Sequence, residues 1–472
     1  MTEHQTENIT ICETTGHLEK LSFCPNAALR AKKLSSEYQL YACRKILIRA
    51  LILNQIPNFA RYPTQLSCLI LGILLLFLPT LSQAAFEKPA THSAQSLLKP
   101  ELLKGKHFSV ADEVQSDGFF YRFSVSSPFG DFTAESMTEL QRLVNEIEAI
   151  AAMKTVKTDD TAIASAKQAG QNTVTGLKNL FTNPEETLEG AAAGVSSLFN
   201  RTRETIGKRK VTDAEDSQVE QVIGLSKAKG KIATQYGVNV YSRNQPLQEE
   251  LERLAWADYL GGLGVGAATS FIPGVGGVVL TVSGTSRLLN EAINTTPPSE
   301  LWLQNKNKLL GLGMDQDTVQ LFLNNHVFTP ALTTVITVAL QSMKGVENLE
   351  LFLKISLQAN TPAMARAISE IAVLTAAYHK RVAPLASIRL FGRIVRAEGA
   401  DGSAVVILPV DRLIWSENVA GLVESLSHEA GADRSKQIWM LGVPSEMASA
   451  ELKKAGYQIH TDVRTDLVPA DK

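Results

Sequence analysis

Hydrophobic and polar positions alternate in two runs, HFSVADEV and FFYRFSVS, and this period of two predicts β-strands. Ser116-Asp117-Gly118 lies between the runs, and an Asp-Gly turn in that position is typical of a β-hairpin. Pro128–Asp131 predicts a second turn, which a third short strand follows. Ser136 and Glu139 have the spacing of a capping box, so a helix is expected to begin there. The apolar face of that helix would consist of Leu140, Leu143, Val144, Ile147 and Ile150.

A helical period returns over residues 246–384, where apolar residues recur every three or four positions. The sequence repeats itself here, because Leu321-Phe322-Leu323 recurs as Leu351-Phe352-Leu353 and Thr329-Pro330 recurs as Thr361-Pro362. Thr followed by Pro is typical of a helix start. The offset between copies is about 30 residues, the length of one pair of antiparallel helices. Two copies are too few for an extended solenoid, so we expect a compact helical domain.

An uncharged, glycine-rich stretch, residues 259–286, lies inside this helical domain. Pro273-Gly274 divides it into two arms, each shorter than the roughly 20 residues of a membrane-spanning helix. Its GLGVGAA segment is similar to a dinucleotide-binding loop, but such a loop follows a strand, whereas residues 247–260 have a helical pattern. Small residues favour close contact between helices. We therefore expect a buried helical hairpin, with a membrane-inserting hairpin as the alternative.

Over residues 385–472 the sequence again contains both strand and helix patterns. The runs IRLFGRIVRAE and SAVVILPV flank Asp401-Gly402, which predicts two strands joined as a hairpin. A helix is expected over residues 417–428, then the strand QIWMLGV, a helix over Ser445–Ala455 and the strand YQIHTDV. The resulting order ββαβαβ predicts a small α/β domain. Its last strand–helix–strand unit is long enough for a parallel crossover.

These patterns together predict an α+β fold that is mainly helical. An N-terminal ββα unit would occupy residues 107–154, the helical domain residues 246–384 and the α/β domain residues 385–472. The intervening residues 85–106 are polar and predict a linker, and residues 155–245 predict amphipathic helices and a linker.

An apolar run from Leu66 to Leu81 predicts export. Eleven of its sixteen residues are Leu, Ile or Phe, and none is charged. Pro79 would end a helix there, and small residues at Ser82 and Ala84 predict signal-peptide cleavage between Ala84 and Ala85. The 65 preceding residues are long for a signal peptide, so the true start lies just before the run or the run is an uncleaved membrane anchor. The protein is then periplasmic, or anchored in the inner membrane with its C-terminal part outside the cytoplasm.

Cysteine usage and charge narrow the function classes further. All four cysteines precede the predicted cleavage site, so the remaining chain can form no disulfide. Their spacing is irregular, and the sequence assigns no metal site. The net charge of −2 and an aromatic content of 6% argue against nucleic-acid binding.

Few residues are candidates for chemistry. Asp411 follows a predicted strand, where acidic catalytic residues occur, but a helix cap or turn residue is the commoner role. Tyr121 and Arg122 could face a ligand or form ordinary cross-strand pairs. His428-Glu429 begins like a zinc-peptidase helix, yet Ala432 stands at the second ligand position. The sequence therefore assigns no catalytic, cofactor-binding or metal-binding residue.

We expect an exported bacterial envelope protein with a binding or assembly role. Its partner would be another envelope protein or a membrane surface, and the sequence indicates no cofactor. Two alternatives stay open: a membrane-inserting protein that uses residues 259–286, and an enzyme with its site in the C-terminal α/β domain.

Overall fold

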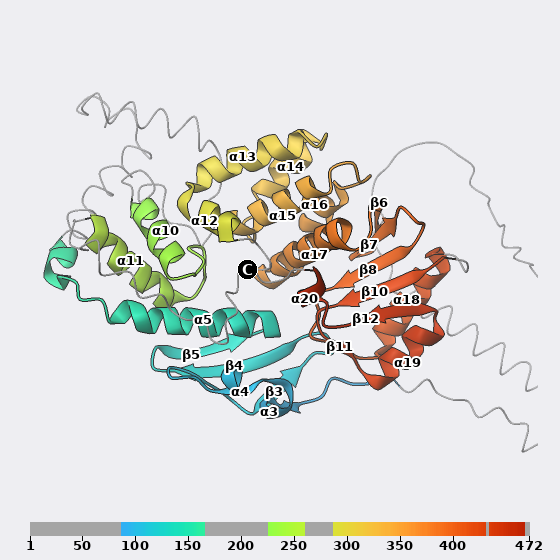
Figure 1. The fold of residues 1–472 in the computed structure, drawn as a ribbon, viewed down its shortest axis with the longest axis horizontal. Coiled ribbons are helices and arrows are strands. Elements are labelled where there is room, and N and C mark those ends of the chain that lie inside the picture. Colours follow the sequence, from blue (N-terminus) through green and yellow to red (C-terminus); the bar gives the residue numbers. More distant parts are fainter. Residues whose placement is uncertain (1–85, 166–224, 260–286, 431–433, 468–472) are drawn as a thin grey trace, which may run out of the picture. The chain divides into compact units, whose positions relative to one another are not determined.

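The computed structural model describes residues 86–165, 225–259, 287–430 and 434–467 (Figure 1). The chain divides into two units between Ala85 and Phe86, and all described residues belong to the second. Several predicted features lie outside the described residues: the apolar run Leu66–Leu81, the cleavage site at Ala84 and Ala85, most of the amphipathic helices and the glycine-rich stretch. The second unit has an α+β fold.

The N-terminal part of this unit is an antiparallel sheet, and both predicted hairpins are confirmed. Strands β3 and β4 pair Ser116 with Tyr121 around a turn in which Gly118 has a φ of 95°. Strands β4 and β5 pair Ser127 with Gly130 around the second turn. The elements are β1 (His92–Ser93), α3 (Ala94–Leu97), α4 (Pro100–Leu103), β2 (Ser109–Val110), β3 (Glu113–Ser116), β4 (Tyr121–Ser127) and β5 (Gly130–Ala134).

Helix α5 (Met137–Lys154) covers this sheet and begins as predicted (Figure 1). The Ser136 hydroxyl accepts a hydrogen bond from the Glu139 N–H at 3.0 Å. The reciprocal contact of a capping box is displaced by one residue, because the Glu139 carboxylate accepts from the N–H of Glu135. The whole predicted apolar face is buried. Leu140, Leu143, Val144 and Ile147 pack in the core against the sheet, whereas Ile150 belongs to a core shared with residues 225–259.

The central part is helical and contains the predicted repeat. Thr329 and Thr361 cap α15 and α17, each accepting a backbone hydrogen bond with its hydroxyl. Phe322 on α14 and Phe352 on α16 are equivalent in the two copies, and both are fully buried. The helices are α10 (Leu225–Gln235), α11 (Gln245–Tyr259), α12 (Arg287–Thr295), α13 (Pro298–Leu310), α14 (Gln316–Leu323), α15 (Pro330–Ser342), α16 (Leu351–Ser356) and α17 (Pro362–Arg381).

The C-terminal sheet has the order β12-β10-β8-β7-β6. Strand β10 is parallel to both β8 and β12, so the predicted crossover is confirmed. One prediction was wrong: IRLFGRIVRAE is not a single strand but a hairpin, because Gly392, with a φ of 59°, turns the chain. The elements are β6 (Leu385–Phe391), β7 (Ile394–Gly399), β8 (Ala404–Leu408), β9 (Arg412–Leu413), α18 (Glu417–Ala430), β10 (Lys436–Met440), β11 (Val443–Pro444), α19 (Glu446–Lys454), β12 (Tyr457–His460) and α20 (Arg464–Leu467).

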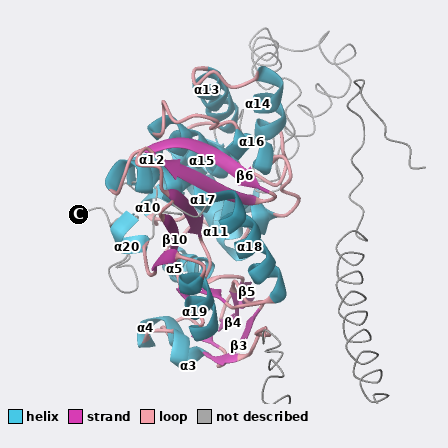
Figure 2. Cartoon of the chain, turned by 90° about the vertical axis from the view of Figure 1, so that its right-hand side faces the viewer, coloured by secondary structure: helices cyan, strands magenta, loops and turns pink. Residues whose placement is uncertain are grey.

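Helices cover both faces of this sheet (Figure 2). Along β8, Val405 and Ile407 belong to the core shared with α17, whereas Val406 belongs to the core under α18 and α19. A strand buried on both faces explains the continuous apolar run at this position. Tyr378 of α17 and Trp439 of β10 pack edge to face at 5.2 Å between ring centroids. A continuous core thus crosses residue 384, where the sequence predicts a domain boundary.

Candidate functional site

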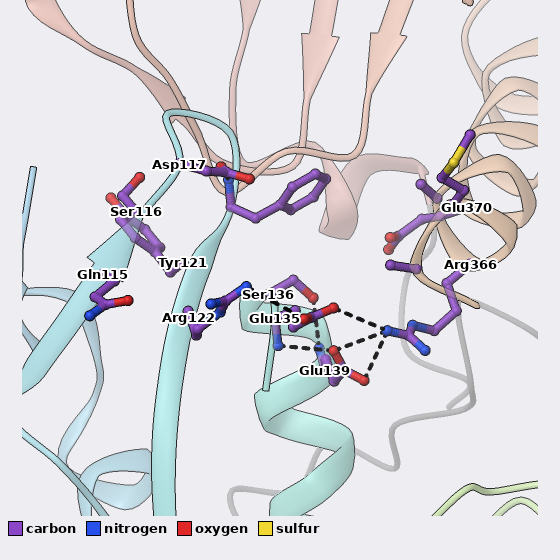
Figure 3. A pocket seen from close by; sticks show the side chains of 14 residues that line it. Gln115, Ser116, Asp117, Tyr121, Arg122, Glu135, Ser136, Glu139, Arg366 and Glu370 are labelled. Atoms are coloured by element: carbon purple, nitrogen blue, oxygen red, sulfur yellow. Dashed lines mark hydrogen bonds and ion pairs between the residues drawn. The ribbon is translucent and has the colours of Figure 1, made fainter. Parts of the chain in front are cut away.

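A cavity of about 390 Å³ opens between the β3–β4 hairpin, the first turn of α5 and α17 (Figure 3). The hairpin and α5 are close in the sequence, whereas α17 follows more than 200 residues later, and together they supply nearly all of the described lining. The residues that line it are Gln115, Ser116, Asp117, Phe120, Tyr121, Arg122, Glu135, Ser136, Glu139, Ala363, Met364, Arg366, Ala367 and Glu370. We call this space the hairpin cavity.

The hairpin turn fixes one wall of the hairpin cavity. The Oδ1 atom of Asp117 accepts backbone hydrogen bonds from Phe119 at 2.8 Å and Phe120 at 2.7 Å. Two features require glycine at position 118: its φ is positive, and a Cβ there would lie 2.7 Å from Cδ1 of Ile414. The tip of the hairpin is also bonded to the C-terminal part, since the Ile414 N–H donates to the Gly118 carbonyl. These contacts hold the hairpin turn, and with it this wall of the hairpin cavity, in one position.

Helix α17 supplies the opposite wall through Arg366 and Glu370, which lie one turn apart. Figure 3 shows Arg366 reaching from α17 toward α5, where its Nη2 atom lies 3.2 Å from Oε1 of Glu139. The same guanidinium lies 3.9 Å from the Glu135 carboxylate. Glu370 forms an ion pair with Arg464, which does not line the hairpin cavity: Nη2 of Arg464 donates to the Glu370 carboxylate at 2.7 Å. Burial raises the pKa of the Glu370 carboxyl, and the Arg464 guanidinium opposes that shift.

The charges that line the hairpin cavity are unequal in number. Among the described residues four carboxylates and two guanidinium groups line it. Arg366 pairs with Glu139, Arg122 lies 3.6 Å from the Glu135 carboxylate, and Glu370 pairs with Arg464. Of the four lining carboxylates, Asp117 is the one without an ion pair in the described part of the chain. The cavity is therefore acidic, and a positively charged group fits it better than an anion does.

Asp411 lies beside this site but is not among its lining residues. Its Oδ2 atom accepts two backbone hydrogen bonds at 3.0 Å, from Tyr121 of β4 and from Met137 at the start of α5. Burial raises the pKa of Asp411 to about 6; the two backbone bonds lower it and the Glu370 charge raises it further. Of the roles weighed from the sequence, capping is the one observed, although the capped helix is α5 rather than α18, the helix that follows Asp411.

The structure places the other sequence candidates as follows. Tyr121 and Arg122 both line the hairpin cavity, and Arg122 also faces Gln115 across the strands. The cross-strand position of Arg122 is confirmed, and its contact with a ligand stays a prediction. Helix α18 carries His428, and no group of three or more His, Cys, Asp or Glu side chains in the described part of the chain could hold a metal ion.

Sequence reasoning missed Glu139, Arg366 and Glu370 as site residues. Glu139 was recognised only for its place in the capping box. Arg366 and Glu370 are four residues apart on a predicted helix, a spacing that puts them on one face. No local pattern indicates that this face meets α5, more than 200 residues earlier in the chain.

None of the described helices combines the length and the apolar character needed to span a membrane. The two segments for which the sequence predicts membrane contact, 66–81 and 259–286, lie outside the described residues. No protein-family model matches the chain, and comparisons with curated proteins and with solved structures gave no significant match. The functional argument therefore depends on the geometry of the site.

Proposed function

We propose that this chain is an exported binding protein of the bacterial envelope, and that the hairpin cavity binds a ligand with a positively charged group. The excess of carboxylates in the lining carries this proposal: four carboxylates line the hairpin cavity against two guanidinium groups, and Asp117 has no ion pair among the described residues. A volume of about 390 Å³ lies within the usual range of small-ligand sites. A cationic group there would offset the excess negative charge.

The apolar lining of the hairpin cavity fits the same kind of ligand. Phe120 and Tyr121 line it from the hairpin, and Met364 lines it from α17. Aromatic rings attract cations at distances of about 6 Å or less. A thioether packs well against methylene groups. A ligand that joins a cation to a short alkyl chain therefore fits the lining better than a compact inorganic cation does.

Two observations support export. The chain divides between Ala85 and Phe86, one residue beyond the predicted cleavage position. Glu87 is held by the C-terminal part: its N–H donates to the Trp415 carbonyl at 2.9 Å, and its carboxylate accepts from the Trp415 N–H and the Ser445 hydroxyl. Cleavage after Ala84 would therefore leave the contacts of Glu87 intact. N-terminal sequencing of the protein from a periplasmic extract should begin at Ala85, and a chain that retains residues 66–81 would indicate an anchor.

Binding is tested by calorimetric titration with agmatine, which carries a guanidinium and an amine on a short alkyl chain. The double variant Asp117→Asn, Glu135→Gln removes two carboxylates, and the Asn carbonyl can still accept both backbone bonds at the turn. Agmatine affinity should fall about tenfold, since each exposed charge pair contributes up to about 1 kcal/mol. The matched control is Glu113→Gln, Asp131→Asn, which changes the net charge equally on exposed residues that do not line the hairpin cavity. Equal affinity of both double variants would overturn the proposal.

The other functional alternatives have less support among the described residues. Membrane insertion depends on residues 259–286, of which the structure describes only Tyr259. An enzyme in the C-terminal α/β part would use Asp411, whose Oδ2 atom is occupied by two backbone N–H groups. We therefore propose binding as the molecular role.

A further inference from the structure

Arg464 connects two elements that line the hairpin cavity, although it does not line the cavity itself. Its Nη2 atom donates to the Glu370 carboxylate on α17 and to the Thr138 hydroxyl on α5, each at 2.7 Å. Val463 and Leu467 flank Arg464 and are buried in the core shared with α17. This packing fixes the backbone from which Arg464 reaches both elements.

Glu370 is the cavity residue that depends on this contact. Figure 3 shows its carboxylate pointing from α17 into the hairpin cavity, and its side chain is only 14% exposed. A carboxylate that loses most of its water stays ionised only where hydrogen bonds and opposite charge compensate. Burial raises the pKa of the Glu370 carboxyl, and the Arg464 guanidinium opposes that shift more than Thr138 or Arg142 does. Arg464 is therefore the main counter-charge of Glu370 among the described residues.

Other ionisable groups line the same cavity or interact with Glu370. The guanidinium groups are those of Arg122, Arg142 and Arg366. The carboxylates are those of Asp117, Glu135, Glu139 and Asp411. Asp466, which shares α20 with Arg464, interacts with His460. The charge of Asp411 interacts with both Glu370 and Arg464, so Asp411 has to be controlled in any test that varies the pH.

We propose that Arg464 is a positioning residue of the hairpin cavity, which keeps the Glu370 carboxylate ionised and directed at the bound cation. The inference rests on the proposed function, in which this cavity binds a positively charged group. Without Arg464, the buried Glu370 carboxylate would take up a proton at a higher pH. A bound cation would then displace that proton into the solvent, so the affinity would depend on pH where the wild type is insensitive.

Calorimetric titration with agmatine between about pH 4 and pH 8 tests this role, because both cationic groups of agmatine stay protonated there. All proteins compared carry Asp411→Asn, which removes the titration of Asp411, and the variant with this change alone is the parent. In Arg464→Gln the midpoint of the rise in affinity with pH should lie about 1–3 units higher than in the parent, since an adjacent opposite charge lowers a carboxyl pKa by that amount. The matched control Arg464→Lys retains the charge and should restore the midpoint.

Glu370→Gln shows whether Arg464 acts through Glu370. With no carboxyl at position 370, adding Arg464→Gln should leave the pH profile of agmatine binding unchanged. A merely structural role of Arg464 would instead weaken binding equally with Glu and with Gln at position 370, and it would move no midpoint.

A second measurement needs no change at Arg464. Titrations at about pH 7 in buffers of different ionisation enthalpy count the protons released on binding. The parent and Glu370→Gln should release the same number, because Arg464 already keeps Glu370 ionised. Additional release by the parent would overturn the inference.

The outcomes separate this inference from the proposed function. If agmatine binds but the midpoint stays unchanged in Arg464→Gln, or shifts equally in the presence of Glu370→Gln, only the inference fails. If agmatine does not bind the wild type, the proposed function and the inference fail together.

Discussion

The Oδ2 atom of Asp411 accepts a hydrogen bond from the N–H of Met137 at 3.0 Å, although 274 residues separate the two in the chain. Met137 is the first residue of α5, so the C-terminal part of the protein caps a helix of the N-terminal part. The same oxygen accepts from the Tyr121 N–H on β4. A carboxylate near a helix N-terminus is favoured by the helix dipole, yet burial makes the charged form of this one costly. One side chain thus joins three segments around the hairpin cavity.

The first prediction concerns the pH dependence of stability. The pKa of Asp411 rises from 3.8 to about 6 on folding, so the folded state binds this proton more tightly than the unfolded state. Its contribution to stability is fully present below pH 3.8 and is lost as the pH rises through about 6. Asp411→Asn cannot ionise, and its carbonyl can accept both backbone bonds. The free energy of unfolding of Asp411→Asn relative to wild type should therefore rise by about 2 kcal/mol between pH 4 and pH 7.

Urea denaturation at several pH values measures this difference. Other groups with shifted pKa values, such as Glu146 and His460, are present in both proteins and largely cancel. Parallel stability curves for the two proteins would show that Asp411 does not titrate in this range.

The second prediction concerns the hydrogen bonds of Asp411 apart from its charge. Asp411→Ala and Asp411→Asn are both uncharged, but only Asn offers an oxygen to the Tyr121 and Met137 N–H groups. Asp411→Ala should be less stable than Asp411→Asn by about 1–3 kcal/mol, because unsatisfied backbone donors are costly. The comparison is made by urea denaturation at one pH. Equal stability would mean that water replaces the carboxylate without cost.

The third prediction concerns Gly118 at the hairpin tip. Gly118→Ala would strain a backbone with a φ of 95° and would place a Cβ 2.7 Å from the buried side chain of Ile414. Gly402 is a matched control, since it also has a positive φ, of 84°, but a Cβ there meets nothing within 4 Å. Gly402→Ala should cost about 1 kcal/mol through backbone strain alone. Gly118→Ala should cost about 1–3 kcal/mol more through overpacking. Equal melting temperatures of the two variants would contradict this close packing.

The features predicted correctly from the sequence are those with local signals. Turns at Asp117-Gly118 and Asp401-Gly402 need a positive φ that few other residues tolerate, and helix caps at Thr329 and Ser445 satisfy neighbouring N–H groups. The split between β6 and β7 was missed because only Gly392 marks it inside an alternating run. A single glycine does not distinguish a turn from the interior of a long strand.

The candidate site could not be predicted in the same way. The Arg366 contact with Glu139 and the Asp411 contact with Met137 depend on how distant segments pack. Their residue types are ordinary on a helix face or after a strand, so the sequence offers no reason to join them. Only Tyr121 and Arg122 were singled out beforehand, because a hairpin with a strong turn signal displays them.

The last prediction concerns the boundary near residue 384. The sequence predicts that residues 385–472 form a separate domain, but Ile388 and Trp439 share one hydrophobic core with Tyr378 of α17. Without α17 these apolar side chains would lose their cover on one face of the sheet, and burial of each contributes about 1.5–3 kcal/mol. We expect the fragment 385–472 to show no cooperative thermal unfolding, whereas the chain from Phe86 to Lys472 unfolds cooperatively. Dispersed amide signals and a sharp melting transition for the fragment would show instead that its own core, under α18 and α19, is sufficient for folding.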